Sequence, residues 1–257
     1  QLGHLSWLKR WYLRLVTRVG LKRAQQVVAV SQYTRDQILR YHGSHFENKL
    51  RVIYEGWEHL LFFANETCGY PKDIPFSKYI LYVGSSRGHK NWGRLIQAIQ
   101  RASHQLPPDW GFVFIGSTKM LSKKHLQLVQ QLNRQRPIIQ ITGWQEDCSL
   151  ASYYRHAQAL IFPSLSEGFG IPILEAYFYR IPLLLSNQAS LPEIAGDAAI
   201  YFDPYNVQDI SDSILHFTKQ SDHTSLIERQ TQRLARYSWK TTSQQLTKLL
   251  QSFCKPL

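Results

Sequence analysis

Two glutamates, Glu167 and Glu175, enclose a short glycine-containing segment whose residue types could bind both a sugar and a phosphate. The segment between them reads Gly-Phe-Gly-Ile-Pro-Ile-Leu, and its glycines let the backbone approach a ligand closely. Carboxylates accept hydrogen bonds from hydroxyl groups, while the free amides at the start of a helix favour an anion. An alternative remains open, in which the glycines serve turn geometry and both glutamates are solvated.

The residues around the pair predict the elements that position it. The apolar run 159–162 is expected to form a buried strand, residues 163–170 a loop and residues 171–179 a helix with a proline in its first turn. Glu167 then lies on a loop at the carboxyl end of a strand, and Glu175 lies about one turn into the helix. Both carboxylates can therefore point into one cleft.

Further strand ends carry residues that could join the same site. The loop 84–91 holds two fixed positive charges, Arg87 and Lys90, which could neutralise a pyrophosphate or could equally be solvated. Gly116 and Gly143 end two more strands, where a base or a ribose could lie against the backbone or where glycine could serve turn chemistry. Because the carboxyl ends of parallel strands meet at one edge of a sheet, these loops are expected to converge on one cleft.

The rest of the chain alternates between apolar runs of strand length and helical segments, which predicts an α/β fold with a doubly wound parallel sheet covered on both faces. Strands are expected at 27–30, 50–54, 79–83, 112–115, 138–142, 159–162, 182–186 and 199–202. Helices are expected at 31–41 with Ser31 as the cap, 91–102, 122–133, 150–156, 171–179, 207–217, 225–235 and 241–253. Residues 55–77 are expected to form an irregular linker because they contain Gly69, Pro71 and Pro75.

Composition excludes several classes of protein. A chain of 257 residues with 44% hydrophobic and 13% aromatic residues can bury one full core and part of a second, so neither a disordered nor a fibrous protein is expected. Cys68, Cys148 and Cys254 are odd in number, far apart and in no C-x-x-C pair. We therefore expect neither a disulfide framework nor a zinc site, and a reducing, cytoplasmic compartment fits best. No apolar run is long enough to span a bilayer, and no signal-peptide pattern occurs.

The net charge of +12 is concentrated near the start of the chain. Residues 1–51 hold ten Lys or Arg against two acidic residues, a net +8, and the other 206 hold twenty against sixteen, a net +4. Apolar residues recur at helical spacing through 5–23, which predicts a basic amphipathic helix with aromatic residues at its apolar edge. Three interpretations stay open: a helix packed on its own domain, contact with an anionic membrane surface, or contact with nucleic acid, which no recognised motif supports.

A series of short motifs occurs in order along the chain. They are Val28-Ala29-Val30-Ser31 with Tyr33-Thr34, Val52-Ile53-Tyr54-Glu55-Gly56, Tyr82-Val83-Gly84 with Lys90-Asn91, Thr142-Gly143, Phe162-Pro163-Ser164, Glu167-Gly168-Phe169-Gly170, Glu175-Ala176, Leu191-Pro192-Glu193, Gly196-Asp197-Ala198-Ala199, Phe202-Asp203-Pro204 and Tyr237-Ser238-Trp239. From residue 27 onward, over about 230 residues, the chain resembles the donor-binding half of a family-4 retaining glycosyltransferase of the GT-B fold, whose sheet is Rossmann-like.

The resemblance implies roles for individual residues. Glu175 would hydrogen-bond the ribose of a nucleotide, Glu167 would bind the donor sugar, and Lys90 would stabilise charge on the leaving nucleoside diphosphate. The implied donor-binding residues are Gly84, Arg87, Lys90, Gly143, Trp144, Glu167, Gly168, Phe169, Gly170, Ile171 and Glu175, of which Lys90 and Glu167 also have catalytic roles. The family usually places an arginine just after the strand-end glycine, where this chain has Ser85, and whether Arg87 replaces it is left open.

The resemblance also implies how the reaction runs. The donor would be a nucleotide sugar, most commonly a UDP- or GDP-sugar, and no metal or other cofactor is expected. The acceptor attacks from the face that the nucleotide leaves, with retention of anomeric configuration and no protein nucleophile, so Glu167 and Glu175 are not a glycosidase pair.

A full member of that family begins with a second Rossmann-like domain, of which only the end is recognised here. Residues 1–75 are expected to be a remnant of this N-terminal domain with a linker, 76–236 the donor-binding domain and 237–257 a helix that crosses back. Two functions follow: the donor half of an active transferase, completed by a separate chain or by further residues, or a binding module that holds a nucleotide sugar without transferring it. The expected partners are the nucleotide sugar, a separate N-terminal-domain chain and an anionic membrane at residues 5–23, without nucleic acid, in the cytoplasm or at the inner face of its membrane.

Overall fold

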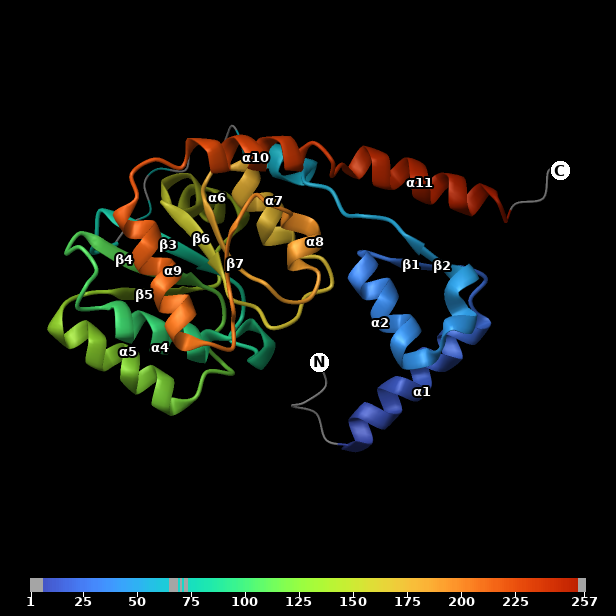
Figure 1. The fold of residues 1–257 in the computed structure, drawn as a ribbon, viewed down its shortest axis with the longest axis horizontal. Helices are drawn as coiled ribbons and strands as arrows, with labels where there is room; N and C mark the ends of the chain where they lie inside the picture. Colours follow the sequence, from blue (N-terminus) through green and yellow to red (C-terminus); the bar gives the residue numbers. More distant parts are fainter. Residues whose placement is uncertain (1–6, 65–68, 70, 72–73, 254–257) are drawn as a thin grey trace.

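The computed structural model describes residues 7–64, 69, 71 and 74–253, which form an α/β fold around a parallel sheet (Figure 1). The sheet contains β3 (Lys78–Val83), β4 (Trp110–Ile115), β5 (Ile139–Gly143), β6 (Ala159–Phe162), β7 (Leu183–Ser186) and β8 (Ile200–Phe202). Their order across the sheet is β5-β4-β3-β6-β7-β8, and every neighbouring pair is parallel. The chain therefore winds outward from β3 in one direction and from β6 in the other. The predicted doubly wound parallel sheet is confirmed.

Helices cover both faces of this sheet because its strands are apolar on both sides. In β3, Leu81 packs into one hydrophobic cluster, while Ile80 and Tyr82 point to the other, as the two-residue period of a strand requires. The first cluster is closed by α6 (Asp147–His156), α7 (Ile171–Phe178), α8 (Leu191–Ala195) and α10 (Thr224–Leu234), and the second by α4 (Trp92–Ala102), α5 (Lys123–Gln135) and α9 (Val207–Lys219). The strand ends are consequently the part of the sheet left open to ligands.

A smaller unit precedes the sheet. It contains α1 (Trp7–Arg23), β1 (Val27–Ala29), α2 (Gln32–His42), the 3-10 helix η1 (Ser44–Lys49) and β2 (Leu50–Val52), and β1 and β2 pair in parallel. The strand expected at 27–30 is present as β1, but Val28 in it is 39% exposed, because β1 has a strand on one side only among the described residues. Exposed apolar side chains also cover α1, among them Trp7, Trp11 and Leu15.

The final helix, α11 (Trp239–Gln251), returns to the smaller unit (Figure 1). The Thr242 hydroxyl donates to the carbonyl of Tyr54 at 2.6 Å, and the Trp239 amide donates to the Glu58 carboxylate at 2.7 Å. Gly56 permits this contact, because a Cβ there would lie 2.0 Å from the Trp239 nitrogen. The division of the chain at residues 75 and 236 stays a prediction.

Several expected elements need correction. The linker 55–77 is not wholly irregular, since it contains the 3-10 helix η2 (Glu58–Leu60) and the short helix α3 (Leu61–Ala64). The sequence pattern also missed α8, whose five residues are too few for a helical period to show. Cys148 is disulfide-bonded, against the expectation of no disulfide, and it is the one cysteine within the described residues.

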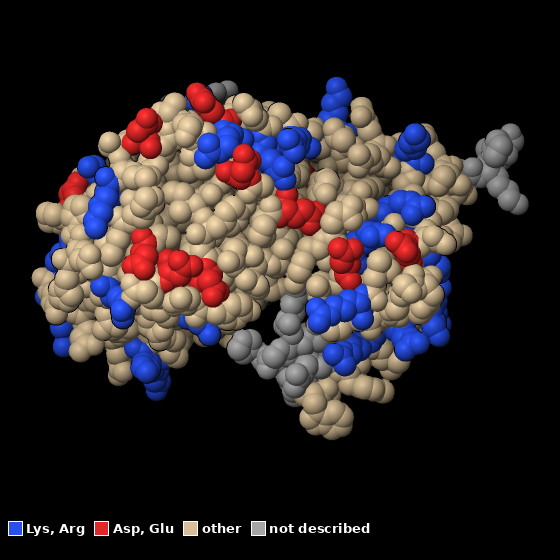
Figure 2. Space-filling model, viewed as in Figure 1, with Lys and Arg blue, Asp and Glu red and all other residues tan. Residues whose placement is uncertain are grey.

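Charge is distributed unevenly over the surface. Basic side chains gather over the unit that carries α1 and α2, in agreement with the excess found in residues 1–51 (Figure 2). Within the residues that the structure describes, no helix is long and apolar enough to cross a membrane.

Candidate functional site

The candidate site lies where the winding of the sheet reverses. β3 and β6 are neighbours in the sheet, and the connections that leave their carboxyl ends run in opposite directions. At such a switch point the two departing loops separate and leave a crevice in which α/β proteins bind ligands. Here the loops are 84–91 after β3 and 163–170 after β6. The Leu165 amide donates to the His89 carbonyl at 2.7 Å, so the loops are in direct contact.

Lys90 and Glu167, one from each loop, form an ion pair at this point. The Lys90 Nζ lies 2.7 Å from Glu167 Oε1, and the side chains are only 18% and 15% exposed. The ammonium group also lies 5.0 Å from the centre of the Phe162 ring. An ion pair this sheltered from water is costly to assemble and is preserved only where both groups are well placed. The structure therefore brings together the two residues to which the resemblance assigned catalytic roles.

Glu175 occupies a more enclosed position, on α7. Its carboxylate accepts a hydrogen bond from the Tyr154 hydroxyl, and the Tyr154 ring stacks on Tyr179 with 5.2 Å between ring centres. Burial raises the pKa of Glu175 above its usual value, against the opposing effects of the Tyr154 hydrogen bond and the positive charge of Lys90. Both glutamates thus interact with the same lysine charge, although Glu175 does not form an ion pair with it among the described residues.

The backbone carbonyls of the loop between the glutamates are hydrogen-bonded to side chains at the starts of α2 and α8. The Gly168 carbonyl accepts from Ser31 and Thr34, and the Glu167 and Phe169 carbonyls accept from the Ser190 hydroxyl, each at 3.0 Å. In the first turn of α7, Pro172 has no N–H and the Ile173 amide donates to the Gly170 carbonyl at 2.9 Å, so the Ile171 amide is the one that an anion would meet there.

Gly170 and Phe169 stabilise the same loop through its backbone conformation and its packing. Gly170 caps α7 with φ at 111°, a conformation that side chains disfavour, so a larger residue would distort the turn. The Phe169 ring is 3% exposed and packs against Tyr54 and Tyr237. Of Phe169, the backbone amide is the group left for a ligand, because the ring is buried and the carbonyl accepts from Ser190.

The remaining predicted residues are spread over neighbouring strand ends. Gly84 directly follows β3, and its amide donates to the carbonyl of Ile115 in β4. Arg87 is exposed and lines a cavity of about 410 Å³ with Arg94 and His125, rather than joining the Lys90 ion pair. Gly143 ends β5 at the edge of the sheet, and Trp144 after it is 75% exposed. The structure therefore does not bring Arg87 or Trp144 into contact with the two glutamates.

Asn91 is a site residue that the analysis of single loops missed. Its side-chain amide donates to the carbonyls of Pro163 at 3.1 Å and Pro204 at 2.8 Å, which joins the loops after β3, β6 and β8. It adopts the left-handed conformation with φ at 62°. Asparagine adopts that region more readily than most residues. An asparagine directly after Lys90 was therefore the sequence feature that could have indicated its role.

A groove borders the ion pair on the side of α2. One cavity of about 460 Å³ is lined by Glu167 and Gly168 together with Tyr33, Gln37 and other residues of α2. A neighbouring cavity of about 450 Å³ shares Tyr33 and Gln37 and extends to Tyr205. Tyrosine rings with amide side chains are suited to contact with sugars, because they offer apolar faces beside hydrogen-bonding groups. Among the described residues, no group of three or more His, Cys, Asp or Glu side chains could hold a metal ion.

Comparison with protein families gives two matches. The family model described as glycosyl transferases group 1 matches residues 73–234, and the model described as glycosyltransferase family 4 matches residues 1–59. The first match covers more than half of the chain and contains every candidate site residue named above from Gly84 to Glu175.

Curated relatives include bacterial mannosyltransferases. O-antigen chain mannosyltransferase B of Escherichia coli is 34% identical over 142 residues, covering 55% of this chain and 37% of that protein. The serotype-specific mannosyltransferase WbdA of Escherichia coli is 27% identical over 90% of this chain and 30% of that protein. O-antigen chain mannosyltransferase RfbU of Salmonella typhimurium is 26% identical over 93% of this chain and 63% of that protein. The chain thus spans between 30% and 63% of the length of these relatives.

Solved structures show the same fold. Anabaena Alr3699/HepE, solved in complex with UDP and glucose, matches with a TM-score of 0.78 and 19% identity, over 98% of this chain and 69% of that one. The sucrose-phosphate synthase of Thermosynechococcus elongatus matches with a TM-score of 0.74 and 19% identity, over 98% and 64%. The architecture described above is accordingly that of GT-B glycosyltransferases.

Proposed function

The chain belongs to the glycosyl transferases group 1 family, and from that premise we propose that it supplies the nucleotide-sugar site of a retaining glycosyltransferase. The observation that carries the proposal is the Lys90–Glu167 ion pair, which places a cation and a carboxylate side by side at the switch point of the sheet. A nucleotide sugar presents a diphosphate next to a polyhydroxylated ring, which calls for this combination of charges at adjacent positions.

Each side chain takes one part of the donor. Lys90 and the Ile171 amide at the start of α7 hold the diphosphate, whose negative charge grows as the nucleotide leaves. Glu167 binds hydroxyls of the sugar, and Glu175 binds those of the ribose. Tyr154 supports this role, because its hydroxyl holds one oxygen of Glu175 and leaves the other to accept from the ligand.

The transfer step breaks the bond between the anomeric carbon and a phosphate oxygen. An acceptor hydroxyl forms the new bond on the same face, and its proton passes to the departing phosphate oxygen. Lys90 stabilises the nucleoside diphosphate as it leaves. Glu167 does not attack the anomeric carbon in this scheme, since it is held by Lys90 and serves to orient the ring.

The donor is proposed to be a UDP- or GDP-hexose. The mannosyltransferases among the relatives favour mannose, and the structure solved with UDP and glucose favours a nucleotide in this site. Contact with the base is assigned to Gly143 and Trp144 at the end of β5, and Arg87 is assigned to the diphosphate on the far side from Glu167. We propose a cytoplasmic location, in which the exposed apolar and basic side chains of α1 would meet an anionic membrane surface.

The proposal is tested by calorimetric titration of the chain with UDP, GDP, UDP-glucose and GDP-mannose. We expect binding of at least one of the four, and we expect Glu175→Ala to abolish it by removing the ribose contact. Glu228→Ala is the matched control, because Glu228 is exposed on α10. Absence of binding at millimolar ligand would contradict the proposal.

Catalysis is a separate question from binding. The alternative to an active transferase is a module that holds the donor without transferring it. We keep this alternative because the chain spans only part of the length of its relatives. Sugar transfer or donor hydrolysis by the chain alone would exclude the alternative. Binding without turnover, with turnover restored by a second chain that carries a further glycosyltransferase domain, would support a divided enzyme.

A further inference from the structure

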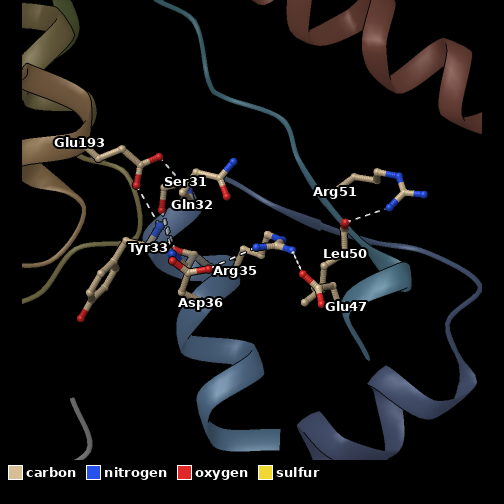
Figure 3. Close-up of polar contacts among 10 residues, drawn as sticks. Ser31, Gln32, Tyr33, Arg35, Asp36, Glu47, Leu50, Arg51 and Glu193 are labelled. Atoms are coloured by element: carbon tan, nitrogen blue, oxygen red, sulfur yellow. Dashed lines mark hydrogen bonds and ion pairs between the residues drawn. The ribbon is translucent and has the colours of Figure 1, made fainter. Parts of the chain in front are cut away.

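The N-terminus of α2 is capped by a residue from a distant part of the chain. Glu193, on α8, accepts hydrogen bonds from the amides of Gln32 at 2.7 Å and Tyr33 at 2.8 Å (Figure 3). Ser31, the residue just before the helix, accepts from the Thr34 amide at 3.0 Å. The first three amides of α2 are therefore all satisfied, two of them by a carboxylate whose charge also suits the positive end of a helix.

The same turn of α2 holds the loop that carries Glu167. The hydroxyls of Ser31 and Thr34 both donate to the carbonyl of Gly168, at 2.5 and 3.0 Å. Gly168 directly follows Glu167, so a shift of this turn would move the peptide that anchors the carboxylate. No comparable tie to α2 comes from Glu175, which is oriented by Tyr154 instead.

Glu193 itself has a firmly held backbone. Arg233 donates to the carbonyls of Glu193 and Ile194, and the Tyr237 hydroxyl donates to the Ile194 carbonyl at 2.9 Å. The Glu193 carboxylate also accepts from the Tyr54 hydroxyl at 3.0 Å, which ties it to the segment after β2. Glu193 thus joins the smaller unit to the sheet domain at the same turn of α2 that contacts Gly168.

We propose that Glu193 is a positioning residue for the donor sugar: by fixing the first turn of α2, it fixes Gly168 and thereby sets where the Glu167 carboxylate stands. This inference rests on the proposed function, in which Glu167 binds the sugar. It predicts that Glu193 matters more for a nucleotide sugar than for the nucleoside diphosphate alone, because the diphosphate and ribose contacts involve Lys90, α7 and Glu175.

The primary test is Glu193→Gln, which keeps the shape and removes the charge. The new side chain has one accepting oxygen, so one of the two helix amides faces an NH2 group and loses its partner. We expect hydrogen exchange at Gln32 or Tyr33 to accelerate by about tenfold or more. In titrations, we expect the dissociation constants of UDP-glucose and GDP-mannose to rise about three- to tenfold more than those of UDP and GDP.

Two further variants make the test specific. Glu228→Gln is the matched control and should change neither exchange nor the ratio of sugar-bearing to free nucleotide affinity. Thr34→Val removes one donor to Gly168 and leaves Glu193 unchanged. It should reproduce the change in affinity ratio if Glu193 acts on Glu167 through the first turn of α2. It also serves as the test if Glu193→Gln fails to fold.

The outcomes are distinguishable from failure of the proposed function. A wild-type chain that binds none of the four nucleotides overturns the proposed function and this inference with it. If the wild type binds, an unchanged affinity ratio in both Glu193→Gln and Thr34→Val overturns the positioning role, even where exchange accelerates. A fall in that affinity ratio in both variants, with the ratio in Glu228→Gln unchanged, supports it.

Discussion

Glu167→Gln separates the two tasks of the ion pair at the candidate site. The substitution preserves the shape of the side chain and leaves Lys90 in place, but it removes the charge 2.7 Å from the ammonium group. Lys90 then becomes available to a diphosphate without competition from the carboxylate. A nucleotide sugar, in contrast, loses the charged acceptor that we assign to its ring hydroxyls.

The magnitudes follow from charge and burial. A carboxylate about 6 Å from a phosphate charge opposes it by roughly 2–3 kcal/mol at an effective dielectric constant of about 20, before salt and Lys90 screen the effect. We therefore expect about 1 kcal/mol of gain for UDP or GDP, an approximately fivefold tighter complex. Loss of one charged hydrogen bond to the sugar costs about 1.5–3 kcal/mol, so the sugar nucleotide should bind about tenfold more weakly or worse.

The assay is calorimetric titration of each variant with the free nucleotide and with the corresponding nucleotide sugar, at low and moderate salt. Glu228→Gln controls for a general change of charge. Stability is measured alongside by urea unfolding. The ion pair is mostly but not fully buried. We therefore expect Glu167→Gln to lower the free energy of unfolding by about 1–3 kcal/mol, between the values for exposed and buried pairs. Equal weakening of free and sugar-bearing nucleotides would refute the assignment of Glu167 to the sugar.

Three further predictions follow from the same geometry. Burial raises the pKa of Glu175 in the folded state, so its contribution to stability is full below the usual value of 4.5 and is lost as pH rises through the raised value. In urea unfolding, Glu175→Gln should therefore gain stability relative to the wild type as pH rises above 4.5, and a difference independent of pH would contradict this. Asn91→Ala should lower the free energy of unfolding by about 2–4 kcal/mol in the same assay, because the carbonyls of Pro163 and Pro204 lose their donor and alanine tolerates the left-handed conformation poorly. A loss under about 0.5 kcal/mol would count against the role of Asn91 in joining these loops. Tyr154→Phe should weaken nucleotide binding about three- to tenfold, with little change in the ratio of the affinities for sugar-bearing and free nucleotides. A selective effect on the sugar nucleotide would argue against a ribose role for Glu175.

The sheet could be predicted from the sequence because its strands are continuous apolar runs. The run 159–162 is fully buried in β6, and the glycine-rich loop after it lies at the carboxyl end of the strand as expected. The same reasoning failed for short or locally ambiguous elements. The five residues of α8 carry no visible period, and the linker 55–77 contains helices despite its glycine and prolines.

The site was only partly accessible to such reasoning. The convergence of Lys90 and Glu167 was predictable because both follow neighbouring strands in a parallel sheet. The bond between Tyr154 and Glu175 was not, since it depends on how α6 and α7 face each other across the sheet edge. Glu193 is separated from its α2 partners by 160 residues or more, and no local spacing could indicate that contact.

The central claim is that a nucleotide sugar binds at the switch point between β3 and β6. It is tested most directly by a crystal structure of the chain with bound UDP or GDP, chosen by the stronger affinity in the titrations. The account predicts the diphosphate within hydrogen-bonding distance of Lys90 Nζ and the Ile171 amide at the start of α7, with the ribose hydroxyls on Glu175. A nucleotide whose phosphates contact neither Lys90 nor the start of α7, with Lys90 still paired only to Glu167, would contradict it.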